Sequence, residues 1–237
     1  MENNILGIET SGIICSVALY KNDIFKEINI NSGLTHSETL FSNLNKLLIE
    51  NNTSIKDLSY IAVSNGPGSY TGLRIGISCA LGLAINDNIN IRYVNTLKSL
   101  SYNIIDYKND NNISINSNDI IVSILDAKAN RVYLGLSIFD NLNNFIIEKI
   151  VTIDELIEIL NTYDNNTYIL GDGLNTYKDN IINLYKNNNL HFVTDIYNYL
   201  NAKNIIIASQ FETNYIENLD INYMQKSQAE RNRINNA

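Results

Sequence analysis

Apolar residues near the start of the chain fall into short runs, which then give way to a helical stripe. Only a few residues separate the runs, as is typical of strands joined by tight turns; they are NILGIE, ICSVALY and DIFKEINI. From His36 onward the period changes, because Leu40, Leu44 and Leu48 recur every four residues with Phe41 beside them. Such a stripe is typical of a helix with one apolar face. The pattern predicts an antiparallel meander of three strands followed by an amphipathic helix.

The rest of the chain repeats this order. A buried strand (YIAVSNG), a glycine-rich helix from about 71 to 86, a strand (IRYV) and a helix (LKSLSYNIIDY) complete the first half. After the polar stretch KNDNNISINSND come three more strand runs, a helix (DELIEILNTY) and a strand (TYILGDG). Further helices are predicted around 177–187 and 205–215. Two successive units of meander, helix and strand predict a duplicated α/β architecture, in which the second copy is shorter and less regular.

The charge of the chain bears on its partners. With 237 residues it can form one large domain or two small ones. Its 17 basic and 25 acidic residues give a net charge of -8, which opposes binding to a polyanion by this chain alone. If the protein serves a nucleic acid, we expect a partner to supply the basic surface.

Targeting signals are not apparent in the sequence. The longest apolar run near the glycine-rich helix, GISCALGLAI, is far too short for a bilayer span. No basic segment followed by an apolar one opens the chain, and NNILGIETSG is typical of a strand and turn. We therefore expect a cytoplasmic protein with no membrane partner.

The cysteines and histidines do not suggest a metal site. Cys15 and Cys79 both lie in apolar runs, and their spacing suits neither a metal nor a disulfide framework. The only histidines, His36 and His191, are far apart in the sequence. We expect buried structural thiols, no metal and no cofactor.

The glycine-rich loop in SNGPGSYTGLRIGISCALGLA raises the question of a phosphate site. Gly66 and Gly68 match the start of the dinucleotide fingerprint G-x-G-x-x-G, but the third glycine, Gly72, comes one position late. A P-loop is excluded because no Lys-Ser or Lys-Thr follows the glycines. The serine motif G-x-S-x-G is also absent, since Pro67 stands where its first glycine would be. The loop therefore fits known nucleotide motifs poorly.

The helix after this loop has small residues on one face. Gly72, Gly76, Ala80 and Ala84 recur every four residues, and Leu73 begins an adjoining apolar row. Such a face would let another backbone approach closely, either from a partner or from the chain's own sheet, and the spacing leaves both alternatives open. Each glycine inside a helix costs about 1 kcal/mol relative to alanine, which implies a packing or contact purpose. Together with the first helix, it predicts a partner interface formed by Leu40, Phe41, Leu44, Leu48, Gly72, Leu73, Gly76, Ala80 and Ala84.

Four stretches carry a family resemblance. ILGIETSGIICSVAL, LTHSETL, VSNGPGSYTGLRIGISCALGLA and LDAKANRVY together resemble the TsaB (YeaZ) family, and the tail NYMQKSQAE fits it as well. The match runs nearly end to end, and the GPGSYTGLRIG block is highly specific. The resemblance implies an α/β protein with a duplicated actin-like (ASKHA, RNase H-like) fold and a reduced second subdomain. We expect the subdomains to be 1–107, with the partner-docking helices, and 108–237.

The resemblance also implies a function. TsaB-like proteins are non-catalytic scaffolds that pair with a TsaD-like transferase and with a TsaE-like ATPase. The complex adds threonylcarbamoyl to adenosine 37 of tRNA, so this chain would meet tRNA only indirectly. Whether the free chain forms a homodimer, and whether a nucleotide binds at the shared interface, stay open.

Several positions depart from the catalytic relatives. In TsaD a metal-binding histidine pair follows the strand after the glycine-rich helix, whereas here 94–101 reads VNTLKSLS. The tail has Asn222 and Gln225 where the family usually has proline and arginine. Degenerate remnants of nucleotide loops would be Glu9, Thr10 and Ser11 in the first half, and Asp126, Ala127 and Lys128, with Gly171 and Gly173, in the second.

An alternative function is a stand-alone small phosphotransferase or peptidase of the same fold. Such an enzyme needs a catalytic base and a bound metal. Glu9 with Asp126 is the only carboxylate pair that the sequence offers for this role. Turnover by the purified chain without partners would distinguish the two functions.

Overall fold

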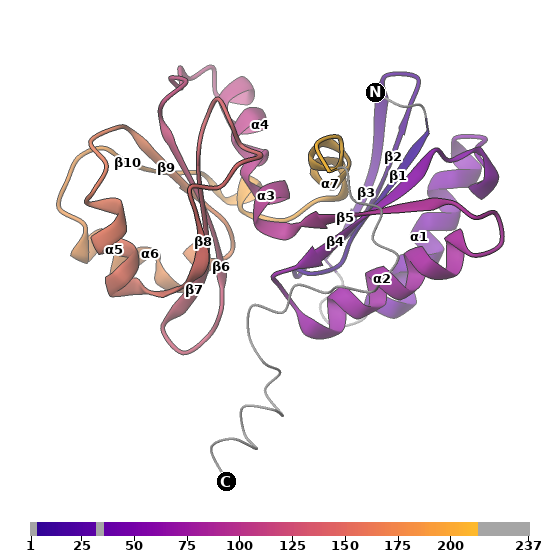
Figure 1. The fold of residues 1–237 in the computed structure, drawn as a ribbon, viewed down its shortest axis with the longest axis horizontal. Helices are drawn as coiled ribbons and strands as arrows, with labels where there is room; N and C mark the ends of the chain where they lie inside the picture. Colours follow the sequence, from indigo (N-terminus) through magenta and orange to yellow (C-terminus); the bar gives the residue numbers. More distant parts are fainter. Residues whose placement is uncertain (1–3, 32–35, 213–237) are drawn as a thin grey trace, which may run out of the picture.

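Two five-stranded sheets form the framework of the part of the chain that the computed structural model describes, residues 4–31 and 36–212 (Figure 1). The first unit contains β1 (Ile5–Glu9), β2 (Cys15–Lys21), β3 (Ile24–Ile30), α1 (His36–Glu50), β4 (Tyr60–Gly66), α2 (Tyr70–Ala84) and β5 (Asn90–Asn95). The second contains β6 (Ile120–Asp126), β7 (Arg131–Ile138), β8 (Ile147–Thr152), α5 (Ile153–Leu160), β9 (Thr167–Leu170), α6 (Gly173–Leu184) and β10 (Leu190–Phe192).

The strand orders confirm the predicted duplication. The first sheet has the order β3-β2-β1-β4-β5, and the second has the matching order β8-β7-β6-β9-β10. In both, the first three strands are antiparallel, while the last two run parallel to the first strand. The second copy is reduced, because α5 has 8 residues where α1 has 15, and β10 has only 3. The α/β fold class predicted from the sequence is therefore observed.

Local sequence accounts for the meander. Asn22 and Asp23 have positive φ values of 51° and 62° between the paired residues Lys21 and Ile24, which is the geometry of a two-residue hairpin turn. β1 is buried along its whole length, whereas the edge strand β3 alternates between exposed and half-buried positions.

Three hydrophobic cores separate the layers. α1 and α2 cover one face of the first sheet, and α5 and α6 cover the outer face of the second (Figure 1). Between the sheets lie α3 (Thr96–Ser101) and α7 (Ala202–Ser209), in a central core that draws residues from both halves of the chain. This shared core ties the two sheets together.

The helix α7 crosses between the halves. It comes from the second half of the sequence but packs on β1 and β2 of the first sheet, while α3 from the first half packs on β6. The division into subdomains 1–107 and 108–237 stays a prediction. The contacts of α3 and α7 cross that boundary.

Some element boundaries differ from the prediction. The helix expected over 97–107 is divided into α3 and α4 (Asn103–Asp110). The buried Asn103 fixes this junction through its side chain. Its Nδ2 donates to the carbonyls of Tyr197 and Tyr199, and its Oδ1 accepts from the side-chain Nδ2 groups of Asn201 and Asn204.

The last helix also begins earlier than expected. α7 starts after Asn201, whose side chain caps it by accepting from the backbone of Asn204 at 2.8 Å. The end of the helix expected over 205–215, and the tail positions Asn222 and Gln225, lie outside the described residues. Within the described ranges, no helix is long and apolar enough to cross a bilayer.

Candidate functional site

Glu9 lies fully buried where β1 ends. The backbone amide and the hydroxyl of Ser11 donate to its Oε1 at 2.5 and 2.6 Å. Its Oε2 and the Oγ of Ser64, on the neighbouring strand, have no hydrogen-bond partner within the described chain. Burial raises the pKa of Glu9, and the bonds from Ser11 lower it, as do the Ser64 hydroxyl and the Gly12 amide, which lie nearby without forming a bond of normal geometry to Oε2. A sealed carboxyl of this kind is not exposed to a metal or substrate.

The glycine-rich loop holds α2 against the turn after β1. The amide of Ser69 donates to the carbonyl of Ser11 at 2.8 Å, and the Ser69 hydroxyl caps α2 by accepting from the amide of Gly72. The Thr10 hydroxyl donates to the Gly72 carbonyl at 2.7 Å. A Cβ at Gly72 would lie 2.0 Å from the Thr10 carbonyl oxygen, so only glycine fits. The close approach of Thr10 therefore explains the glycine at position 72 without a bound phosphate.

The corresponding loop of the second half is closed by an ion pair. Lys128 donates to Asp126 through its backbone amide at 2.7 Å and through its Nζ at 2.6 Å. The hydroxyl of Tyr177 also donates to Asp126, at 3.3 Å. These bonds hold the pKa of Asp126 below its usual value, although burial opposes them. Lys128, Ala129 and Asn130 all have positive φ, so the turn is made without glycine.

Gly171 and Gly173 belong to a close turn between β9 and α6. Gly171 has φ of 119°, and a Cβ there would lie 2.0 Å from the carbonyl oxygen of Ile124. Asp172 between them accepts from the amide of Asp126 at 3.1 Å, and burial raises the pKa of Asp172. Packing against β6 therefore accounts for both glycines.

The described residues offer no metal centre. Among them, no group of three or more His, Cys, Asp or Glu side chains could hold a metal ion. His191 is exposed, stacks on Tyr168 and contacts Asn166 at 3.2 Å. The segment 94–101 forms the end of β5 and α3, and it carries no histidine.

The predicted small-residue face turns inward. Gly76, Ala80 and Ala84 are buried, and a Cβ at Gly76 would lie 2.4 Å from the Thr10 hydroxyl oxygen. This face therefore packs on the chain's own sheet, which is the second of the two alternatives that the spacing left open. The other predicted interface residues that are buried in the chain are Leu40, Leu44, Leu48, Gly72 and Leu73. Phe41 is the exception, being 53% exposed.

A different row of side chains faces outward from these helices. Along α2 it comprises Tyr70, Arg74 and Leu81, followed by Ile85 directly after the helix, all at helical spacing. The guanidinium of Arg74 lies 4.0 Å from the centre of the Tyr70 ring. On α1 it comprises Phe41 and Ile49. We call these six residues the outer row. Of these six residues, only Phe41 was predicted as an interface residue. The others could have been identified as the positions on each helix that face away from its buried apolar stripe.

The chain is similar to known proteins over most of its length. The model of the family described as TsaD, tRNA N6-adenosine threonylcarbamoyltransferase, matches residues 31–232. A protein of Buchnera aphidicola subsp. Schizaphis graminum named tRNA threonylcarbamoyladenosine biosynthesis protein TsaB is 30% identical over 210 residues, covering 87% of this chain and 92% of the relative. A protein of the same name from Bacillus subtilis is 31% identical, covering 75% and 74%.

A solved structure shares the fold. YeaZ from Pseudomonas aeruginosa superposes with a TM-score of 0.70 at 19% identity, covering 89% of this chain and 92% of that chain.

Proposed function

Because the chain belongs to the TsaB family, we propose that it is the non-catalytic subunit of a tRNA threonylcarbamoyladenosine biosynthesis complex, which binds and activates a TsaD-like transferase. One observation carries this proposal. In the turns after β1 and after β6, where related nucleotide-binding proteins hold phosphates, the acidic residue is bonded to the chain's own neighbouring residue. Glu9 is sealed by Ser11, and Asp126 is held by Lys128. A protein of this fold without an open loop is better suited to supporting a catalytic partner.

The outer row of α1 and α2 is the surface proposed for the transferase. Its apolar members include Ile49, 75% exposed, and Ile85, 78% exposed. Apolar side chains gathered on adjacent helices are typical of a protein interface. A TsaE-like ATPase would join the resulting complex, and tRNA would contact this chain only through its partners. We propose the same face for a homodimer of the free chain.

The rival function is a stand-alone phosphotransferase or peptidase. It would rely on the pair Glu9 and Asp126, and both carboxyls are engaged with neighbours in the structure. We expect the purified chain alone to transfer no threonylcarbamoyl group, and a TsaD-like transferase to gain activity when it is added. The measurement is the modified nucleoside content of tRNA after incubation with each protein and with both. Turnover by the repurified chain alone, dependent on Glu9 or Asp126, would favour the rival.

The outer row provides a test of the interface. Phe41→Asp and Leu81→Asp should each weaken binding to the transferase about tenfold or more, because each places a charge in an apolar interface. Both side chains are exposed in the free chain, so the melting temperature should change little. Ile196→Asp is the matched control, since Ile196 is 73% exposed and lies outside α1 and α2. If all three variants bind the transferase equally well, this surface is not the interface.

A further inference from the structure

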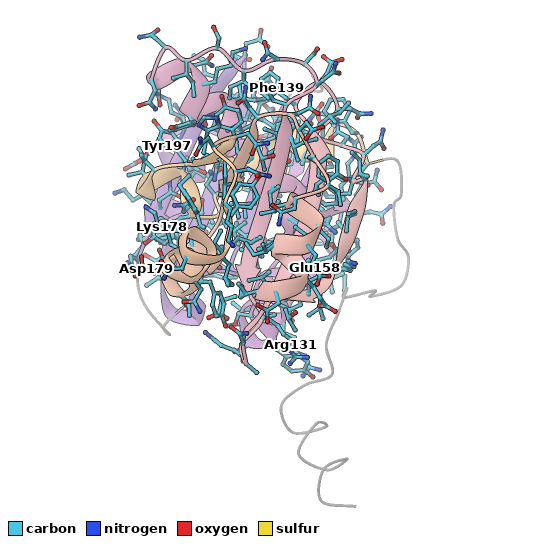
Figure 2. The ribbon with its side chains drawn as sticks, turned by 90° about the vertical axis from the view of Figure 1, so that its left-hand side faces the viewer. Arg131, Phe139, Glu158, Lys178, Asp179 and Tyr197 are labelled. Carbon is cyan, nitrogen blue, oxygen red and sulfur yellow. The ribbon has the colours of Figure 1, made fainter. Side chains whose placement is uncertain are left out.

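A cavity of about 580 Å³ lies beside the central core, in a place that the proposed function does not use. Such a volume is in the usual range for small-molecule sites. Figure 2 places Phe139 at one end of the molecule and Arg131, which follows the Asp126 loop, at the other. The cavity is therefore separate from the nucleotide-type loop of the second half. It is lined by Tyr102, Ile105, Phe139, Asp140, Asn141, Leu142, Asn143, Asn144 and Phe211.

Two nearly parallel aromatic rings line this cavity. The rings of Tyr102 and Phe211 are nearly parallel, with an angle of 16° and centroids 6.5 Å apart. Tyr102 is buried, and its hydroxyl donates to Oδ1 of Asn143 at 2.7 Å, which fixes the ring. Phe211 is 57% exposed. An exposed ring beside a fixed one is a stacking surface for a planar ligand.

The loop after β7 presents amide groups in a fixed arrangement. The amide of Asn141 donates to the carbonyl of Ile138 at 3.0 Å, and Nδ2 of Asn144 donates to Oδ1 of Asn141 at 3.1 Å. Within the described chain, Asn143 uses its side-chain oxygen and Asn144 its side-chain nitrogen. A donor on Asn143 and an acceptor on Asn144 are thus left for a ligand. A base with a ring-nitrogen acceptor beside an amino donor would use both groups, and adenine and cytosine each have such an edge. Adenine, the larger ring system, offers more surface for stacking on the two aromatic side chains.

The charges around the cavity disfavour a phosphate. Asp140 lines the cavity, and a carboxylate accepts from an amino group but repels an anion. Neither of the two nearby lysines lines the cavity, so Asp140 is the one charged residue of the lining that the described chain provides. Lys98 is paired with Glu212 at 2.6 Å, and the Nζ of Lys108 lies 4.8 Å from the centre of the Phe139 ring. We propose that this cavity binds an adenine base that carries no phosphate, as in adenosine. This site is independent of the transferase interface.

Titration of the full chain with adenosine, inosine and AMP, followed by calorimetry or ligand-observed NMR, tests this site. Adenosine should bind saturably. Inosine has a carbonyl in place of the amino group, and AMP adds a phosphate, so each should bind at least about fivefold more weakly. Phe211→Ala should weaken adenosine binding about tenfold or more, whereas Phe211→Tyr keeps the ring and should bind as the unchanged chain does.

Control measurements decide between the outcomes. Ile182→Ala removes an equally exposed apolar side chain, 50% exposed on α6, and should leave adenosine binding unchanged. Melting curves confirm that the Phe211 variants are folded. The proposal is wrong if adenosine does not saturate the chain below about 10 mM, or if folded Phe211→Ala binds it normally. Equal binding of inosine, or tighter binding of a short oligoadenylate strand, would likewise overturn the ligand class.

Discussion

Gly72→Ala will destabilise the protein by about 3 kcal/mol, although it adds a single methyl group. The new Cβ would lie 2.0 Å from the carbonyl oxygen of Thr10, which is backbone and cannot rotate away. Either the turn after β1 or the start of α2 must shift, and the bond from the Thr10 hydroxyl to the Gly72 carbonyl would be strained. For a chain of this size, the melting temperature should fall by about 6–12 °C.

Gly82→Ala is the matched control, because the same substitution is made on the same helix. Gly82 is exposed, and an added Cβ would meet no atom within 4 Å. Alanine is the better helix former, so this variant should be more stable by about 0.5–1 kcal/mol. Opposite signs for the two variants would show that contact with Thr10, and not helix propensity, sets the requirement for glycine. If Gly72→Ala has the same melting temperature as the unchanged chain, the close approach of α2 to this turn is wrong.

For the small-residue face of α2, the sequence predicted the positions but not the neighbour that they pack against. A spacing of four residues correctly placed Gly72, Gly76 and Ala80 on one side of a helix. It could not say what lies opposite, because a sheet of the same chain and a helix of a partner make the same demand for small residues. The position of Thr10, 62 residues from Gly72 in the sequence, decides this. Gly76→Leu is therefore expected to reduce stability before it affects any partner.

Other features followed more directly from the sequence. Both meanders were predictable, since their strands are short apolar-rich segments bounded by turn residues. The strand β10 was not, because three residues are too few to establish a period. The ion pair between Lys128 and Asp126 was also missed as a pair, although both residues were named. The two residues meet in a turn where Lys128 has a positive φ of 63°, a conformation that the sequence did not indicate.

Glu9→Gln should remove a pH dependence from the stability of the protein. Burial raises the pKa of Glu9 in the folded chain above its value of 4.5 in the unfolded one, so the folded state binds the proton more tightly. The favourable contribution is complete below pH 4.5 and is lost as the pH rises through the folded pKa. Glutamine keeps an oxygen for the bonds from Ser11 and supplies a donor near the hydroxyl of Ser64. The variant should therefore gain stability relative to the unchanged chain as the pH rises.

Denaturant unfolding of both chains at a series of pH values measures this difference. Asp172, whose pKa is also raised by burial, titrates in both chains, so subtracting one curve from the other isolates Glu9. Glu155→Gln supplies a control of opposite sign. Bonds from the backbone and hydroxyl of Thr152 lower the pKa of Glu155, so its contribution is present above the unfolded pKa and is lost as the pH falls. Difference curves of the same sign for the two glutamates would contradict a Glu9 carboxyl whose burial outweighs its hydrogen bonds. They would also remove the reason for treating this loop as closed to ligands.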